Sequence, residues 1–259
     1  MAEESALKPF YSVLVLAFVC SALVAGAAVG LRPLQEKNRQ LDQKKNILRA
    51  AGILEANIPV EEQFKVVEPR LIELTSGNFV AAENRPPAPY NQVQAAFTND
   101  LGRPLKKEAD LARITRVEKF SYVYLIFKEG ELDQIILPVR GKGLWSTMFA
   151  YVALNADLNS IRGISFYAHG ETPGLGGEIE NRSWQRSWEN KQVYDDNDTV
   201  RLQVVKGSAA GEHQKYQVDG LSGATMTSTG VSDLMQFWFG EHGFKPFIKR
   251  MREKENANG

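Results

Sequence analysis

The sequence has few residues of the kinds that hold metals or form disulfides. Its 259 residues include a single cysteine, Cys20, and three histidines, at positions 169, 213 and 242. One cysteine excludes an intramolecular disulfide, a cysteine zinc site and a thiolate-bound iron–sulfur cluster within this chain. Because the histidines lack the spacing of a ligand set, we expect no protein-held metal.

The chain also has no excess of charge of either sign. Lys and Arg number 31, as do Asp and Glu, so no overall field attracts nucleic acid, and we expect none to bind. The P-loop, a dinucleotide fingerprint in a parallel βαβ context and the Gly-x-Ser-x-Gly nucleophile elbow are all absent. A hydrophobic content of 43% is enough for one core of ordinary size.

Charge is missing altogether from residues 10–31, after a short polar tail over residues 1–9. These 22 residues are long enough to cross the membrane as a helix. A cleaved signal peptide is the alternative, because small residues lie near the end of the stretch. We favour a retained transmembrane helix, since signal-peptide hydrophobic regions run shorter and the tail has only Lys8 against Glu3 and Glu4.

Small residues recur along this helix. Ala22, Gly26 and Gly30 are spaced by four, which places them on one face and favours close approach of a partner helix. The alternative is that membrane helices are generally rich in Gly and Ala. The helix has no ionisable group apart from Cys20 and Tyr11, so we do not expect it to conduct an ion.

Basic residues are concentrated after the helix, where five lie within 14 positions, whereas Lys8 alone precedes it. The positive-inside rule by itself therefore predicts a cytoplasmic position for the large domain. The basic residues are Arg32, Lys37, Arg39, Lys44 and Lys45.

Residues 32–118 read as a connecting and accessory region. The pattern predicts a helix continuing out of the membrane from 34 to about 54, a short helix over 60–67 and a strand over 70–78. The Arg-Pro-Pro-Ala-Pro run at 85–89 is incompatible with a helix or a central strand, so we expect a linker. Residues 110–116 are too weakly patterned to assign.

Residues 119–259 read as a compact domain. A hairpin is predicted over 121–140, because two β-rich runs flank a Glu-Gly turn. Further strands are expected at 148–154, 161–168 and 200–205, and helices at 179–191 and 227–241. The predicted fold class is α+β, in which a single amino-terminal transmembrane helix precedes a domain with a mainly antiparallel sheet and packed helices.

Three loops in this domain have the composition of a ligand site. We name them the Trp145 loop (residues 141–146), the Glu171 loop (169–177) and the Thr225 turn (219–228). Glycines in each let backbone amides approach a ligand closely, although a plain turn explains any one of them alone.

Hydroxyl groups crowd the Thr225 turn. Helix capping accounts for one hydroxyl but not for the five at 222, 225, 227, 228 and 229. A helix amino terminus with free amides is a phosphate site, and a threonine there can be esterified to that phosphate.

The Thr225 turn resembles a known motif. Asp219 followed by Ser222-Gly223-Ala224-Thr225 resembles the flavinylation motif Asp-x-x-Ser/Thr-Gly-Ala-Thr of FMN-binding domains in respiratory electron-transfer complexes. The Gly-Lys-Gly-Leu-Trp-Ser and His-Gly-Glu-Thr-Pro-Gly-Leu-Gly segments of the other two loops resemble further signatures of this domain. Together with the single anchor, they make the chain similar to the family of C subunits of Na+-translocating NADH:quinone oxidoreductases.

This resemblance implies a covalent flavoprotein. In the family a flavin transferase takes FMN from FAD and links its phosphate to the last threonine of the motif, here Thr225. The chain would relay electrons through FMN as one component of the NADH:quinone reductase, without a complete active site of its own. The implied partners are the other membrane and redox subunits. The implied location is the bacterial inner membrane with the domain in the periplasm, which contradicts the charge count.

The resemblance also suggests how the cofactor is held. Trp145 and Leu175 would contact the ring, and Glu171 and Thr172 would offer hydrogen bonds. Lys206 would bring a positive charge that favours the anionic reduced flavin. Core packing is the alternative for Trp145, and solvated turn or strand-end positions are the alternatives for the polar residues. The remaining residues expected to bind the cofactor are Gly176, Ser222, Gly223 and Ala224.

Other functions remain open at this point. The related G subunit of the Rnf complex shares the flavinylation motif and the Glu-Thr-Pro-Gly-Leu-Gly segment. A stand-alone membrane-anchored flavin reductase, or an anchored sensor that binds a phosphorylated ligand non-covalently, would also use such a turn.

Overall fold

The structure, a computed structural model, describes residues 7–258, and the side chains of residues 7–254. The chain divides into two compact units, and the boundary between them lies between Gln43 and Lys44. Helix α1, Leu7–Ala50, runs through the first unit and into the second. The predicted membrane helix and its continuation are thus one helix with Pro33 inside it, and it ends near Gly52, whose φ of 71° suits the end of a helix.

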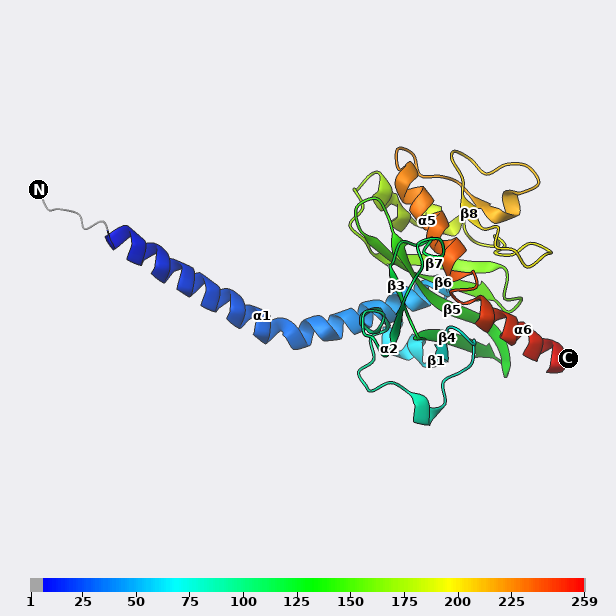
Figure 1. Cartoon of the computed structure of the whole chain (residues 1–259), viewed down its shortest axis with the longest axis horizontal. Helices are drawn as coiled ribbons and strands as arrows, with labels where there is room; N and C mark the ends of the chain where they lie inside the picture. The colour runs from blue at the N-terminus through cyan, green and yellow to red at the C-terminus, as the bar shows by residue number, and fades with distance from the viewer. Residues whose placement is uncertain (1–6, 259) are drawn as a thin grey trace, which may run out of the picture. The chain divides into compact units, whose positions relative to one another are not determined.

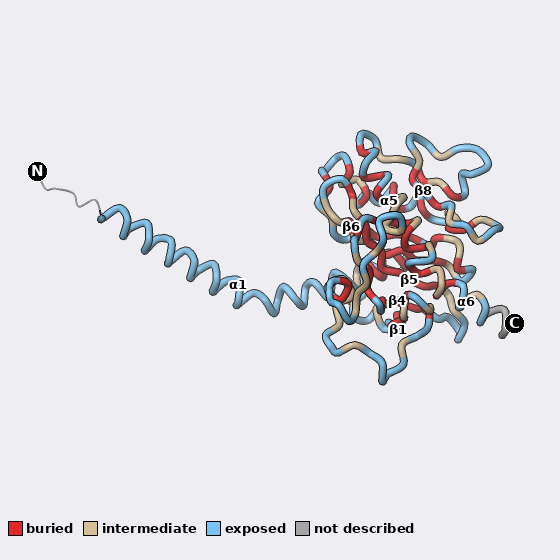
Figure 2. The backbone as a smooth tube through the Cα atoms, viewed as in Figure 1, coloured by how far each residue is buried: buried red, intermediate tan, exposed pale blue. Residues whose placement is uncertain are grey.

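In the first unit, residues 7–40 form a helix that is exposed throughout (Figure 2), and residues 10–31 of it carry no charge. The most apolar 18-residue window of α1 has a mean hydropathy of 2.5 and none of it is buried. In the described part of the chain it is the one helix with the length and composition to cross a membrane. An apolar surface of this kind is favourable in lipid, where the backbone hydrogen bonds of a helix satisfy all its polar groups.

The second unit is built on a five-stranded antiparallel sheet with the order β1-β4-β5-β6-β7 (Figure 1). Its strands are β1 (Val67–Glu73), β4 (Phe120–Lys128), β5 (Glu131–Lys142), β6 (Thr147–Asn155) and β7 (Ile161–Ala168). Two small pairs accompany it, formed by β2 (Gly102–Pro104) with β3 (Arg116–Glu118) and by β8 (Gln203–Val204) with β9 (Gln217–Val218). The short helices are α2 (Val60–Gln63), α3 (Gln92–Ala95), α4 (Arg182–Arg186), η1 (Phe64–Val66), η2 (Ala82–Asn84), η3 (Gly176–Glu180) and η4 (Gln214–Tyr216).

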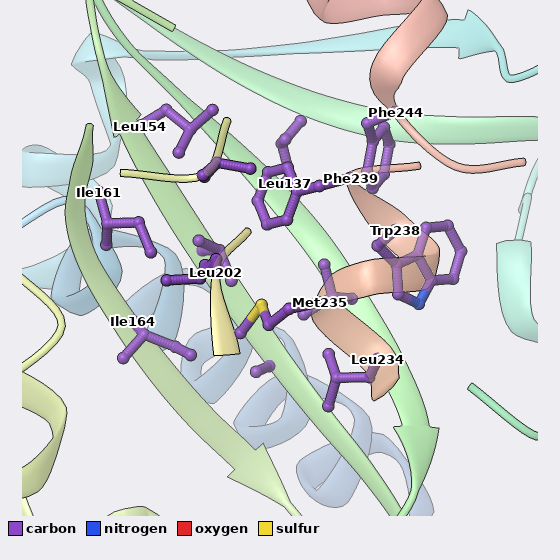
Figure 3. Packing of buried hydrophobic residues seen from close by; sticks show 14 of the residues in the cluster. Leu137, Leu154, Ile161, Ile164, Leu202, Leu234, Met235, Trp238, Phe239 and Phe244 are labelled. Atoms are coloured by element: carbon purple, nitrogen blue, oxygen red, sulfur yellow. The ribbon is translucent and has the colours of Figure 1, made fainter. Parts of the chain in front are cut away.

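The sheet buries both of its faces because its strands alternate between two cores. On one face, Ile135 and Leu137 of β5 join the core made by helices α5 (Thr225–Trp238) and α6 (Lys245–Asn258). On the other, Ile136 packs against Ile47 and Leu48 at the end of α1. Figure 3 shows part of the first core, with Leu234, Met235 and Trp238 contributed by α5. The α5 side of this sheet positions the loops described below.

The structure confirms the fold class and the central strands. The predicted hairpin is β4 and β5, joined by Glu129 and Gly130, both at positive φ as a two-residue turn requires. β6 and β7 match the predicted strands 148–154 and 161–168. The helix predicted at 227–241 is α5, which begins at Thr225 and ends at Trp238.

Other predicted bounds were wrong. The helix expected at 179–191 is a 3-10 turn followed by only the five residues of α4. It stops early because the hydroxyl of Ser187 donates to the carbonyl of Trp184 and Asn190 adopts a left-handed φ of 62°. The strand expected at 200–205 is reduced to β8, which pairs in parallel with β9.

The amino-terminal part of the domain also differs in detail. The strand expected at 70–78 is β1, which ends at Glu73 before a turn with Gly77 at a φ of 69°. The helix expected at 60–67 is α2 followed by a 3-10 turn. Helix α6 was not predicted, although apolar residues at 244, 247, 248 and 251 have helical spacing.

The predicted accessory region contributes to the main sheet. β1 lies within residues 32–118, yet it pairs with β4 along its whole length. β3 supplies Glu118, whose carboxylate binds the guanidinium of Arg140 on β5. Residues 44–118 therefore fold together with the rest of the second unit, and the boundary at residue 118 stays a prediction from sequence.

Candidate functional site

The three loops singled out in the sequence lie together at the amino-terminal end of α5. Gly176 faces Thr227 so closely that a Cβ on the glycine would overlap with the threonine hydroxyl. A Cβ on Gly223 would lie 2.9 Å from Cδ2 of Leu175. Gly176 is therefore required by the close approach of one loop to another. Gly223 is required by its φ of 70°, because the end of the exposed Leu175 side chain could move away.

Gly230 brings the Trp145 loop against α5. A Cβ on Gly230 would lie 2.5 Å from the carbonyl oxygen of Lys142 and 3.2 Å from Cα of Gly143. In an exposed helix, Gly to Ala stabilises by about 1 kcal/mol. Here we expect the opposite sign, because backbone atoms occupy the space.

Gly230→Ala should therefore lower the free energy of unfolding by about 1–3 kcal/mol through overpacking. Urea unfolding of the full chain in detergent measures this. Thr229→Ala is the matched control, since Thr229 is exposed on the same helix and should change stability by less than about 0.5 kcal/mol. A stabilised Gly230→Ala protein would contradict the packing described here.

Glu171 is buried where the three loops meet. Glu171 is 4% exposed, and its carboxylate accepts four hydrogen bonds. Three come from consecutive backbone amides, of Leu144 at 3.1 Å, Trp145 at 3.0 Å and Ser146 at 3.1 Å. The fourth comes from the hydroxyl of Thr227 at 2.6 Å. The carboxylate thereby joins the Glu171 loop to the Trp145 loop and to α5.

These hydrogen bonds control the charge of Glu171. Burial raises its pKa, but the hydrogen bonds from Thr227 and from the amides of Trp145, Ser146 and Leu144 outweigh burial and hold the pKa below its ordinary value. Glu171 is therefore ionised at neutral pH.

The lowered pKa predicts an effect of pH on stability. A depressed folded-state pKa means that Glu171 stabilises the fold above its unfolded pKa of about 4.3 and loses this contribution as pH falls through the folded value. The difference in melting temperature between the native chain and Glu171→Gln should be largest at pH 6–7 and shrink below about pH 4.3. Thermal unfolding from pH 7 to pH 3 measures it, and a difference independent of pH would contradict the ionised state.

The Thr225 turn is held by side chains from its surroundings. The indole of Trp184 donates to the carbonyl of Asp219 at 2.8 Å, and the carboxylate of Asp219 accepts from the amide of Ala209 at 2.7 Å. The hydroxyl of Ser228 accepts from the amide of Leu221 at 3.2 Å. These hydrogen bonds therefore hold the backbone of the turn that precedes α5 in the chain.

The hydroxyls of the turn do not cap the helix. α5 starts at Thr225, and no side chain accepts a hydrogen bond from its first amides in the described part of the chain. Thr227 and Ser228 are engaged elsewhere, as described above. Thr225 itself is exposed and is the first residue of the helix. The capping alternative is thus wrong, and the uncapped amides point to a place for an anion.

Exposed apolar side chains accompany Thr225. Trp145 is 66% exposed and Leu175 45%, so the core-packing alternative for Trp145 is wrong. Leu144 at 45% and Met226 at 52% add to this apolar surface, and neither was predicted from the sequence. Their positions beside Trp145 and Thr225 in the sequence were the available signal. Apolar groups exposed together are typical of a binding surface.

The remaining candidate residues lie in the same region but are less constrained. Lys206 is exposed on a bend next to the Thr225 turn, since the amide of Gly220 donates to the carbonyl of Gly207 at 2.9 Å. The carbonyl of Thr172 accepts from two amides within its own loop, and its side chain is exposed. Ser222 is exposed as well, whereas Ala224 is 6% exposed. Their contacts with a cofactor stay predictions.

Comparison with known proteins shows the family of this chain. The FMN-binding domain family matches residues 143–240, which include most of the Trp145 loop and all of the other two. The chain is 43% identical to the C subunit of the Na(+)-translocating NADH-quinone reductase of Yersinia pestis, over 99% of this chain and 97% of that protein. The chain belongs to this C-subunit family. The corresponding protein of Pseudomonas aeruginosa is 42% identical over 98% of both chains.

The fold of the C-subunit family has also been observed by crystallography. The crystal structure of Shewanella oneidensis NqrC superposes with a TM-score of 0.75 at 33% identity, covering 83% of this chain and 99% of that one. The α+β fold is therefore shared within the family. The resemblance to the C-subunit family that the motifs in the three loops indicated is thereby confirmed.

The residues at the site fit an FMN group. Uncapped amides at the start of α5 suit a phosphate, and the exposed hydroxyl of Thr225 lies on the same turn. The exposed surfaces of Trp145 and Leu175 suit a planar aromatic ring. No basic side chain is required for the phosphate, because the helix dipole contributes partial positive charge.

Proposed function

We propose that this chain carries FMN on Thr225 as the electron-transfer subunit of a membrane-bound Na+-translocating NADH-quinone reductase. Membership of the C-subunit family and the match to the FMN-binding domain support the role and the cofactor. The observation that supports attachment at Thr225 is that this residue is exposed and is the first residue of a helix that has no side-chain cap.

The chemistry of attachment follows from this position. A phosphate esterified to the hydroxyl of Thr225 would lie next to the amides of the first turn of α5, which stabilise its negative charge. Thr225 is then a passive anchor, because an ester needs only its oxygen. A flavin transferase supplies the chemistry of its formation, and the chain supplies the acceptor.

Trp145 and Leu175 would bind the isoalloxazine ring through their exposed apolar surfaces. Lys206, on the bend next to the Thr225 turn, would add positive charge near the cofactor. When bound, FMN supplies the electron-transfer chemistry. The chain's residues orient it and set its surroundings, and the ester prevents its loss.

Intact mass tests this proposal directly. The full chain is expressed with and without the flavin transferase, and peptides are mapped after digestion. We expect an increase of one FMN phosphoester only with the transferase, confined to the peptide that carries Thr225. A mass increase on another peptide, or none, would refute attachment at this residue.

The membrane anchor supports a position within a larger complex. The chain is membrane-anchored through α1, and a Cβ on either Gly26 or Gly30 would meet nothing within 4 Å. A helix of another protein in the complex would approach at these positions.

We also propose that the domain from Lys44 onward faces the periplasm, as in the family, although basic residues after the helix favour the cytoplasm. Large domains translocate despite flanking charge. Protease treatment of intact spheroplasts tests the orientation. Digestion of the domain without lysis is expected, and protection until lysis would overturn this placement.

A further inference from the structure

Glu171 is unusual as a buried ionised group. In the part of the chain that the structure describes, no lysine or arginine forms an ion pair with it. Removing a charge from water is costly unless hydrogen bonds replace the lost hydration. Four protein donors replace it here.

These four donors occupy all the acceptor positions of the carboxylate. An ionised carboxylate offers about four lone-pair positions on its two oxygens. Oε1 accepts from the amides of Trp145 and Ser146, and Oε2 accepts from the amide of Leu144 and the hydroxyl of Thr227. No acceptor position is left for a flavin. The expected hydrogen bond between the Glu171 side chain and the cofactor therefore has no place in this geometry.

What the carboxylate does instead is shape the Trp145 loop. Three consecutive amides turn toward one anion, which fixes the backbone on both sides of Trp145. The neighbouring Gly143 is required for this approach, since a Cβ there would lie 2.5 Å from Oε1 of Glu171. The hydroxyl of Ser146 also accepts from the amide of Gly170, so the two loops are joined twice.

The fourth hydrogen bond connects Glu171 to α5, the helix that begins at Thr225. Thr227 is two residues after Thr225 on the first turn of α5, and it is 1% exposed. Gly176, against which Thr227 packs, keeps the Glu171 loop close to that turn. The backbone of Trp145 is thus tied through one side chain to the turn that carries Thr225.

We propose that Glu171 is a positioning residue that holds the Trp145 loop against the first turn of α5. It places the indole of Trp145 beside the ring of a flavin attached to Thr225, without touching the flavin. This role rests on the proposed function. The four hydrogen bonds to Glu171, which we call the Glu171 clamp, are present in the flavin-free protein. Loss of the clamp frees the Trp145 loop and changes the surroundings of the flavin, while attachment at Thr225 continues.

Glu171→Gln is the sharpest variant because it keeps the size of the side chain. A carboxamide has one acceptor oxygen, so two of the four donors would face an NH2 group. Thr227→Val removes only the link to α5, and Thr227→Ser restores a hydroxyl there. Glu189→Gln is the control, since Glu189 is exposed in the turn that follows α4 and makes none of the hydrogen bonds that hold Glu171.

The first measurement is hydrogen exchange on the flavin-free full chain in detergent, expressed without the transferase. We expect the amides of residues 144–146 to exchange at least tenfold faster in Glu171→Gln and Thr227→Val than in the native chain. Thr227→Ser and Glu189→Gln should exchange at the native rate. Unchanged exchange in both Glu171→Gln and Thr227→Val would overturn the clamp. If Glu171→Gln does not fold, Thr227→Val decides the matter alone.

The second measurement is made on the chain expressed with the transferase. In-gel fluorescence should give flavin yields within twofold of native for every variant, whereas the visible circular dichroism of the flavin should change in Glu171→Gln and Thr227→Val and not in Thr227→Ser. A native flavin spectrum in both altered variants would overturn the positioning role. Absence of flavin from native Thr225 would instead refute the proposed function and leave the exchange result standing.

Discussion

Thr225→Val should abolish the covalent flavin completely. Valine has the shape of threonine but no oxygen to esterify, so no fluorescent band is expected on a denaturing gel after expression with the transferase. Because Thr225 is exposed, the substitution should change the free energy of unfolding by less than about 0.5 kcal/mol. The loss of flavin would then be chemical and would not come from misfolding.

Thr229→Val is the matched control for this result. Thr229 is also an exposed threonine of α5, one turn further along the helix. It should keep a band of native intensity. A fluorescent Thr225→Val protein, or a dark Thr229→Val protein, would show that the ester is formed at a different hydroxyl.

The sequence allowed the Thr225 turn and the start of α5 to be located because the information for them is local. Residues 219–228 form a contiguous motif, and the helix that follows has apolar residues at helical spacing. The hairpin of β4 and β5 was predictable for a similar reason, since Glu129-Gly130 separates two β-rich runs. In both cases the residues that determine the structure are neighbours in the chain.

The role of Glu171 could not be predicted in the same way. Its partners lie at 144–146 and at 227, so they are brought to it only by the fold of the sheet and α5. In sequence, a glutamate in a glycine-rich loop is indistinguishable from a solvated turn residue or a ligand to a cofactor. Early termination of α4 had a comparable cause, because hydroxyl and left-handed backbone positions compete with helix continuation.

The pair of Glu118 and Arg140 depends still more on tertiary structure. The two residues are 22 positions apart, and neither lies in a recognisable motif. β3 and β5 bring them together, with contacts of 2.6 Å and 3.1 Å between guanidinium and carboxylate. Glu118 is 0% exposed and Arg140 5%. A buried pair of this kind makes a strong prediction about stability.

Glu118→Ala should be among the most destabilising substitutions in the second unit. It leaves the guanidinium of Arg140 buried without its carboxylate, which costs about 3–5 kcal/mol. Arg140 has little freedom to move into solvent, because its guanidinium lies 5.2 Å from the ring centre of Trp238, whose indole donates to the carbonyl of Arg140 at 2.6 Å. Urea unfolding of the full chain in detergent measures the loss.

A double variant separates the cost of an unpaired charge from the value of the pair. Glu118→Leu combined with Arg140→Met removes both charges and keeps apolar volume, so it should be less destabilised than Glu118→Ala, since buried pairs are often replaceable by apolar groups. Arg70→Ala, which breaks the exposed pair of Arg70 and Glu68, should cost less than about 1 kcal/mol. A double variant as unstable as Glu118→Ala would mean that the pair stabilises the fold through its own attraction, beyond the avoidance of a buried charge.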